Sequence, residues 1–180
     1  MVAAIALLLA LADAPSPANI KAAAEYSASK NGISYLMMHR GKVVAEEYPN
    51  RGAAGRAAEL ASGTKSFSGV LALCAQEDGL LRLDEKVSDT LPEWRDDSRK
   101  TITIRQLLSL TSGIPGGQNA LAGGKVPSYT EAIQVKATRQ PDARFQYGPN
   151  PFMIFGEVLR RKLEPKKESV MDYMERRLFK

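Results

Sequence analysis

The N-terminal third of the sequence combines one helical pattern with two short β-rich segments. Apolar residues recur at helical spacing over residues 18–31, and Asn31-Gly32 then supplies a helix stop. Residues 33–38 and 43–48 are rich in β-branched and large apolar side chains, and they flank Arg40-Gly41-Lys42. Two such segments around a short glycine-containing turn predict an antiparallel β-hairpin.

The remaining sequence predicts helices joined by turns. Residues 66–76 are apolar on nearly every face, which predicts a buried helix. Residues 102–110 predict a short extended segment that enters a helix, and residues 151–163 predict a long helix, with a short one around Tyr173. A hairpin followed by helices does not match the alternating strands and helices of a doubly wound sheet. We therefore expect an α+β fold.

The first residues have the features of an export signal. Residues 1–12 form an apolar run that is too short to span a bilayer, which takes about 20 residues. Ala10-Leu11-Ala12 has the small-x-small form that signal peptidase accepts, although no Lys or Arg precedes the run. We expect residues 1–17 to be a signal peptide with a short linker, and the protein to be secreted or periplasmic. A buried N-terminal helix or a misplaced start is the alternative.

Composition excludes several kinds of site. The chain has 180 residues, of which 44% are hydrophobic, with one cysteine (Cys74) and one histidine (His39). A disulfide framework, a His/Cys zinc site and an iron–sulfur cluster are therefore out of reach, and we expect neither a metal nor a cofactor. The net charge of +5 is mild, and no aromatic residues interleave with the basic ones. We expect no nucleic-acid partner and no membrane span.

Serine chemistry is open to the chain through lysine rather than histidine. No G-x-S-x-G sequence occurs, and His39 lies at the end of a predicted strand. A lysine three positions after a serine on a helix can instead accept the serine's proton. Two such sequences occur, Ser27 to Lys30 and Ser62 to Lys65, where 13 serines and 12 lysines in 180 positions give about one by chance. Spacing alone therefore identifies nothing.

Context favours the second sequence. Ser27 and Lys30 lie at the polar end of a predicted helix, where a lysine interacts with the carbonyl ends. Ser62 opens the apolar helix, whose N-terminal N–H groups favour a developing oxyanion. Lys65 follows one turn later and is expected on the buried side. The alternative role of Ser62 is that of a helix N-cap.

Six segments together carry a family resemblance. They are Glu59 to Phe67, Gly79 to Val87, Leu91 to Trp94, Ile102 to Ile114, Ala143 to Asn150 and Phe155 to Leu159. Through these segments the sequence resembles the serine β-lactamase/penicillin-binding-protein superfamily, in the branch of class C β-lactamases, D-alanyl-D-alanine carboxypeptidases and related esterases. The resemblance covers roughly residues 33–180, although Gln106 and Leu110 stand where the family usually has histidines.

The resemblance implies a fold and a reaction. The fold is α+β and β-lactamase/transpeptidase-like, with an antiparallel sheet flanked by helices and a helical subdomain, and residues 18–180 form its N-terminal portion. The reaction is acyl-enzyme formation on an ester, a β-lactam or a D-Ala-D-Ala-type amide, on a small or peptidoglycan-like substrate. Ser62 would be the nucleophile, Lys65 its proton partner and Tyr147 the second base.

Two departures from the family pattern weaken the expected activity. Pro149 stands where the family has an asparagine, so either Asn150 replaces it in binding the substrate amide or that contact is lost, which favours esters. The family's third motif, Lys/His-x-Gly, would lie beyond Lys180. We therefore expect a domain incomplete at its C-terminus and a poorly active chain. The alternatives are a non-catalytic binding module and an inactive truncated remnant.

Overall fold

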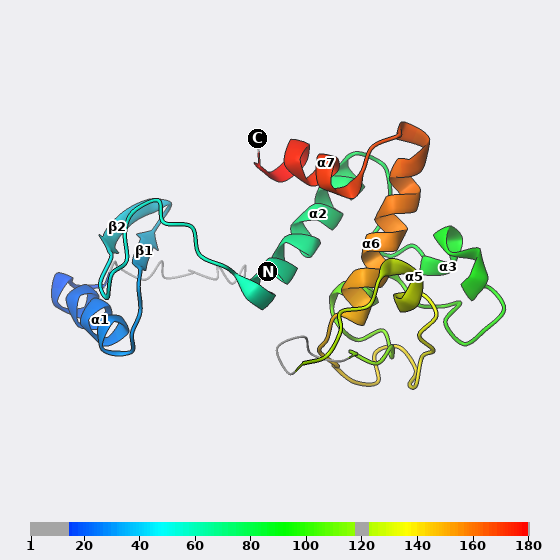
Figure 1. The fold of residues 1–180 in the computed structure, drawn as a ribbon, viewed down its shortest axis with the longest axis horizontal. Helices are drawn as coiled ribbons and strands as arrows, with labels where there is room; N and C mark the ends of the chain where they lie inside the picture. Colours follow the sequence, from blue (N-terminus) through cyan, green and yellow to red (C-terminus); the bar gives the residue numbers. More distant parts are fainter. Residues whose placement is uncertain (1–14, 118–122, 180) are drawn as a thin grey trace, which may run out of the picture. The chain divides into compact units, whose positions relative to one another are not determined.

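The computed structural model describes residues 15–117 and 123–179, which form two compact units (Figure 1). One unit ends at Glu59 and the other begins at Leu60. The predicted hydrolase portion, residues 18–180, extends over both units. Most of the predicted signal peptide, residues 1–14, lies outside the described residues, so export stays a prediction.

The N-terminal unit contains a helix and the predicted hairpin. Helix α1 (Pro17–Ser29) is capped by Ser16, whose hydroxyl accepts a hydrogen bond from the Asn19 N–H. Strands β1 (Tyr35–His39) and β2 (Lys42–Glu47) pair antiparallel. The two residues between them, Arg40 and Gly41, have φ angles of 50° and 76°. A type I′ turn needs positive φ at both positions, and the glycine meets this demand without strain.

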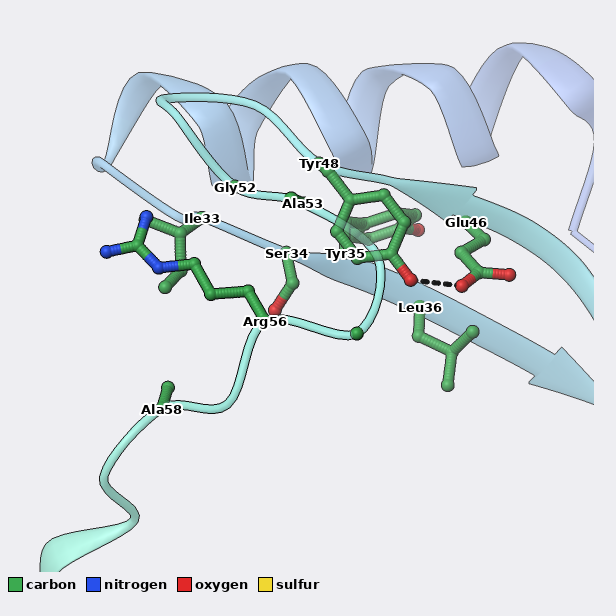
Figure 2. A pocket seen from close by; sticks show the side chains of 11 residues that line it. Ile33, Ser34, Tyr35, Leu36, Glu46, Tyr48, Gly52, Ala53, Arg56 and Ala58 are labelled. Atoms are coloured by element: carbon green, nitrogen blue, oxygen red, sulfur yellow. Dashed lines mark hydrogen bonds between the residues drawn. The ribbon is translucent and has the colours of Figure 1, made fainter.

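A cavity of about 300 Å³ opens in this unit, between the start of β1 and the chain that follows β2 (Figure 2). Tyr48 donates a hydrogen bond to Glu46 at its edge, and this bond raises the pKa of the Tyr48 phenol. The lining residues include Ile33, Leu36 and Arg56, and none of the predicted catalytic residues. The candidate chemistry therefore lies in the other unit.

The C-terminal unit is helical. A 3₁₀ turn, η1, leads into helix α2, and short helices then alternate with irregular chain until the long helix α6. The elements in order are η1 (Ala61–Lys65), α2 (Ser66–Glu77), α3 (Val87–Thr90), η2 (Pro92–Trp94), α4 (Ile104–Leu108), α5 (Tyr129–Ala132), α6 (Asn150–Leu163), η4 (Glu164–Lys166), α7 (Val170–Met174) and the π-helical η5 (Glu175–Phe179). The predicted helices over 66–76, 151–163 and around Tyr173 are thereby confirmed.

Helix α6 is the centre of the core of this unit. It packs against α3, α4, α5 and α7, and its Ile154, Val158 and Leu159 side chains are completely buried. Trp94 is also fully buried, and its indole N–H donates to the Ile133 carbonyl at 2.9 Å. The Arg99 guanidinium stacks 4.5 Å from the Trp94 ring. This core fixes the chain that enters α6, which carries part of the candidate site.

The prediction that α2 is buried on nearly every face was wrong. Leu71, Ala72 and Ala75 are buried, but Val70 is 49% exposed and Leu73 is 54% exposed. The helix therefore packs through one face only. An apolar composition allows a helix to be buried on all sides, but its actual burial depends on which neighbouring elements pack against it.

Neither a membrane span nor a metal cluster is found in the described residues. No helix in residues 15–117 and 123–179 combines the length and the apolar character that crossing a bilayer requires. Over the same residues, no three His, Cys, Asp or Glu side chains gather in a group that could hold a metal ion.

Candidate functional site

Ser62 and Lys65 lie together on η1, the turn before α2. Side chains three residues apart are stacked above one another in a 3₁₀ helix. The Lys65 Nζ accordingly donates a hydrogen bond to the Ser62 Oγ at 3.1 Å. Ala61 enters this turn with a φ of 45°, a left-handed conformation that is rare for alanine. Backbone strain of this kind clusters at functional sites.

Ser62 does not act as a helix cap in this structure. The N-cap positions of η1 and α2 are Leu60 and Lys65, and neither helix has a side-chain capping hydrogen bond. The Ser62 hydroxyl instead faces Lys65. The helix-cap explanation for this serine therefore lacks the contact on which it depends. Lys65, expected on the buried side, is only partly buried.

Tyr147 joins the pair from a distant part of the sequence. The Lys65 Nζ lies 5.4 Å from the centroid of the Tyr147 ring. Hydrogen bonding with Ser62 lowers the pKa of the Tyr147 phenol below its ordinary value near 10, and hydrogen bonding and charge from Lys65 lower it further. Tyr147 is 53% exposed, so water screens part of this effect. The three predicted catalytic residues are thus neighbours.

The segment that carries Tyr147 is hydrogen-bonded to α4 and to the turn that follows it. The Asp142 carboxylate accepts hydrogen bonds from Gln106 Nε2 at 2.6 Å and from Thr111 Oγ1 at 2.8 Å. Closer to the tyrosine, the Gln146 N–H donates to the Leu110 carbonyl at 2.8 Å. These bonds hold residues 142–146 in place without using the Tyr147 side chain.

Asn150 lies at the start of α6 and is 6% exposed. Its Nδ2 donates to the Pro115 carbonyl at 2.9 Å, and its backbone N–H donates to the Gly116 carbonyl at 3.0 Å. The side-chain donor is therefore engaged inside the protein. Binding of a substrate amide by Asn150 stays a prediction.

Sequence reasoning missed the part that Asp142 and Gln106 play. Gln106 was noted only as a departure from the family's histidine. In the structure its side chain closes a capping box, in which Thr103 N donates to Gln106 Oε1 at 3.0 Å and Gln106 N donates to Thr103 Oγ1 at 3.2 Å. The Thr-x-x-Gln pattern before an apolar segment is a signal for this arrangement. No local pattern signals the bond from Gln106 to Asp142.

Comparison with known sequences identifies the family. The beta-lactamase family model matches residues 19–180. Protein flp of Staphylococcus aureus strain NCTC 8325 is 36% identical over 110 residues, which cover 56% of this chain and 22% of the relative. Protein flp of strain N315 is 31% identical over the same shares of each chain. The chain spans about a fifth of the length of these curated relatives.

Comparison with solved structures agrees on the fold. A putative beta-lactamase from Bacteroides dorei DSM 17855 superimposes with a TM-score of 0.70 at 19% identity, over 84% of this chain and 47% of that one. A class C beta lactamase from Rhodobacter sphaeroides gives 0.65 at 21% identity, over 89% and 47%. The octameric penicillin-binding protein homologue from Pyrococcus abyssi gives 0.65 at 19% identity, over 92% and 42%.

These similarities confirm the predicted α+β, β-lactamase/transpeptidase-like fold. The family match runs through both units and includes every residue of the candidate site. The chain belongs to the beta-lactamase family.

Proposed function

We propose that this chain carries the nucleophile of a serine hydrolase that works through an acyl-enzyme on Ser62. One observation carries the proposal: the Ser62 hydroxyl accepts a hydrogen bond from the Lys65 amine at 3.1 Å and also hydrogen-bonds with the Tyr147 phenol. A serine hydroxyl is a weak nucleophile until a neighbouring group accepts its proton. This serine has two such neighbours.

The direction of the hydrogen bonds supports a role for each group. Lys65 donates to the Ser62 Oγ, which leaves the serine O–H free to donate to the phenol oxygen of Tyr147. In the proposed step, Ser62 Oγ bonds to the substrate carbonyl carbon while its proton passes to the Tyr147 phenolate. Tyr147 then returns that proton to the leaving group as the carbonyl re-forms. The positive charge of Lys65 stabilises the phenolate before the first transfer and again after the second.

Water completes the cycle. It attacks the acyl ester on Ser62 and loses its proton to Tyr147. Tyr147 passes that proton to the Ser62 Oγ as the bond to the acyl group breaks, which releases a carboxylic acid and restores the serine. Deacylation repeats the acylation step with water as the nucleophile in place of Ser62, so the same three side chains act in both steps.

Among acyl substrates, the site favours esters over peptide-like amides and β-lactams. Pro149 has no side-chain donor, and the Asn150 amide is bonded to Pro115 O. Neither position 149 nor position 150 therefore offers a free side-chain amide to recognise an acylamino group. An ester also leaves as an alcohol, which departs more readily than an amine. The ester preference extends the family-level assignment, and substrate profiling is its test.

Covalent labelling tests the nucleophile directly. The purified chain is incubated with a fluorophosphonate and, separately, with a penicillin, and the intact mass is read. We expect an adduct with the fluorophosphonate that disappears in Ser62→Ala. Ser27→Ala is the matched control, because Ser27 also precedes a lysine by three positions, and it should label like the wild type.

Each other outcome has a meaning. An adduct of equal size on Ser62→Ala places the reactive group elsewhere and contradicts the proposal. Absence of any adduct on a folded chain, shown by circular dichroism, favours the non-catalytic binding module. A penicillin adduct that forms as fast as the fluorophosphonate adduct contradicts the ester preference and leaves the nucleophile in place.

A further inference from the structure

Two stretches of backbone meet beside the candidate site without room for side chains. A Cβ built on Gly116 would collide with the Tyr147 carbonyl oxygen, and a Cβ built on Gly148 would collide with the Gly116 carbonyl oxygen. The Gly116 carbonyl also accepts the Asn150 N–H at 3.0 Å. Backbone approach this close requires glycine at both positions. The backbone of Tyr147 therefore rests directly on Gly116.

The Asn150 side chain closes this contact from one end. Its Nδ2 donates to the Pro115 carbonyl, 2.9 Å away. Its Oδ1 lies against Gly117, where an added Cβ would approach to 2.6 Å. The amide is thus enclosed by the turn over residues 115–117. Because Asn150 is also the first residue of α6, it ties this turn to the buried core of the unit.

The Tyr147 ring has little packing of its own. It is 53% exposed, so burial does not fix its place beside Lys65. Its position depends on the backbone on either side. On the N-terminal side Asp142 and Gln146 bond to α4 and to the turn after it, and on the C-terminal side Asn150 bonds to the 115–117 turn.

We propose that Asn150 is a positioning residue that holds Tyr147 at Ser62 and Lys65 by clamping the tyrosine backbone onto Gly116. The inference rests on the proposed function for its consequence in catalysis, since Tyr147 is the proton acceptor there. Asn150 then acts through Tyr147 and does not touch the substrate. Asp142 is the anchor at the opposite end of the segment.

The test reads the Tyr147 phenol itself. The chain is labelled with [¹³Cζ]tyrosine and titrated by NMR, and Tyr147→Phe assigns the resonance. In the wild type we expect Tyr147 to titrate below the ordinary pKa near 10. In Asn150→Ala we expect its pKa to rise toward that value, because the phenol drifts from Ser62 and Lys65. Asn150→Ser keeps a donor for Pro115 O and should restore much of the lowered value.

A second tyrosine serves as the internal control. Tyr173 is fully buried and donates to Asp78 at 2.7 Å, and burial raises its pKa to about 12. Its titration should be the same in every folded variant. A Tyr147 titration that stays at its wild-type position in Asn150→Ala, with Tyr173 unchanged, overturns the proposal.

The exposed end of the segment provides a second measurement if Asn150→Ala does not fold. Asp142 has a φ of 63°, which glycine adopts without strain, so Asp142→Gly keeps the backbone conformation and loses the bonds from both Gln106 and Thr111. We expect a smaller upward shift of the Tyr147 pKa, and an unchanged value overturns the two-ended clamp. The titration needs no reaction at Ser62, so failure of labelling with a normal Asn150 effect refutes the proposed function alone.

Discussion

The chain contains the same four-residue sequence pattern in each of its two units, and in the second copy the lysine side chain hydrogen-bonds the serine. Both lysines lie over a tyrosine ring, Lys30 at 5.5 Å from Tyr26 and Lys65 at 5.4 Å from Tyr147. Tyr26 precedes Lys30 by one turn of the same helix, so that contact is local. Lys65 instead bonds Ser62, and its tyrosine comes from the segment before α6.

The difference shows what the spacing does and does not supply. Three residues on a helical turn bring a serine and a lysine within reach in either copy. A proton acceptor on the far side of the serine has to come from tertiary structure. In the C-terminal unit the proposed acceptor is Tyr147, which lies on a segment that hydrogen bonds hold at both ends.

Replacing the lysines should give the largest contrast between the copies. We expect Lys65→Ala to slow fluorophosphonate labelling of Ser62 by about 10²–10⁴-fold, the usual contribution of a positioned proton-transfer group. Lys30→Ala should leave the rate within about twofold, since the Lys30 amine lies over the Tyr26 ring and this pair belongs to the N-terminal unit. Labelling time courses by intact mass measure both. Equal slowing in the two variants would show that the loss is not local to the site.

Replacing the tyrosines should give the next contrast. Tyr147→Phe removes the phenol oxygen and keeps the ring over Lys65, so we expect labelling to slow by about 10²-fold. Tyr26→Phe, at a tyrosine that is 67% exposed, should have no measurable effect. A Tyr147→Phe chain that labels at the wild-type rate would exclude the phenol as proton acceptor and leave Lys65 in that role.

The pH dependence of labelling should sharpen the assignment. A base works when deprotonated, so the rate should rise with pH through the pKa of Tyr147, which lies below the ordinary value near 10. Tyr147→Phe should lose this rise. Because the site is exposed, high salt should screen Lys65 and move the rise to higher pH. A rise that persists unchanged in Tyr147→Phe belongs to another group.

The smallest expected effect concerns stability. Ser62 caps no helix, so Ser62→Ala should change the free energy of unfolding by no more than about 0.5 kcal/mol. Thr103 does cap α4, and Thr103→Ala should cost about 1 kcal/mol. Urea melts measure the two variants side by side. A loss of about 1 kcal/mol in Ser62→Ala would revive the helix-cap explanation for this serine.

The sequence predicted local structure well because local structure follows from short-range patterns. The turn Arg40-Gly41 with its flanking strands, and the stop at Asn31, whose φ is 61°, depend on a few adjacent residues. The burial of α2 could not be predicted from such patterns, because Val70 and Leu73 are exposed despite their apolar character.

The candidate site shows the same difference between local contacts, which could be predicted, and long-range contacts, which could not. The Ser62–Lys65 contact follows from spacing and could be predicted from the residues. The approach of Tyr147 came from the family resemblance, because no periodicity connects residues so far apart. The engagement of Asn150 with Pro115 was not visible at all, since a carbonyl partner leaves no mark on side-chain identity.

Gly116 and Gly148 are two positions at which a substitution can abolish activity, although neither glycine carries a reactive atom. Since a single methyl group at either would meet backbone oxygen, the damage from substitution there does not scale with side-chain size or polarity. A deep mutational scan would show both as uniformly intolerant, in the same class as Ser62. Directed-evolution libraries aimed at new acyl substrates should keep these two codons fixed and vary other positions.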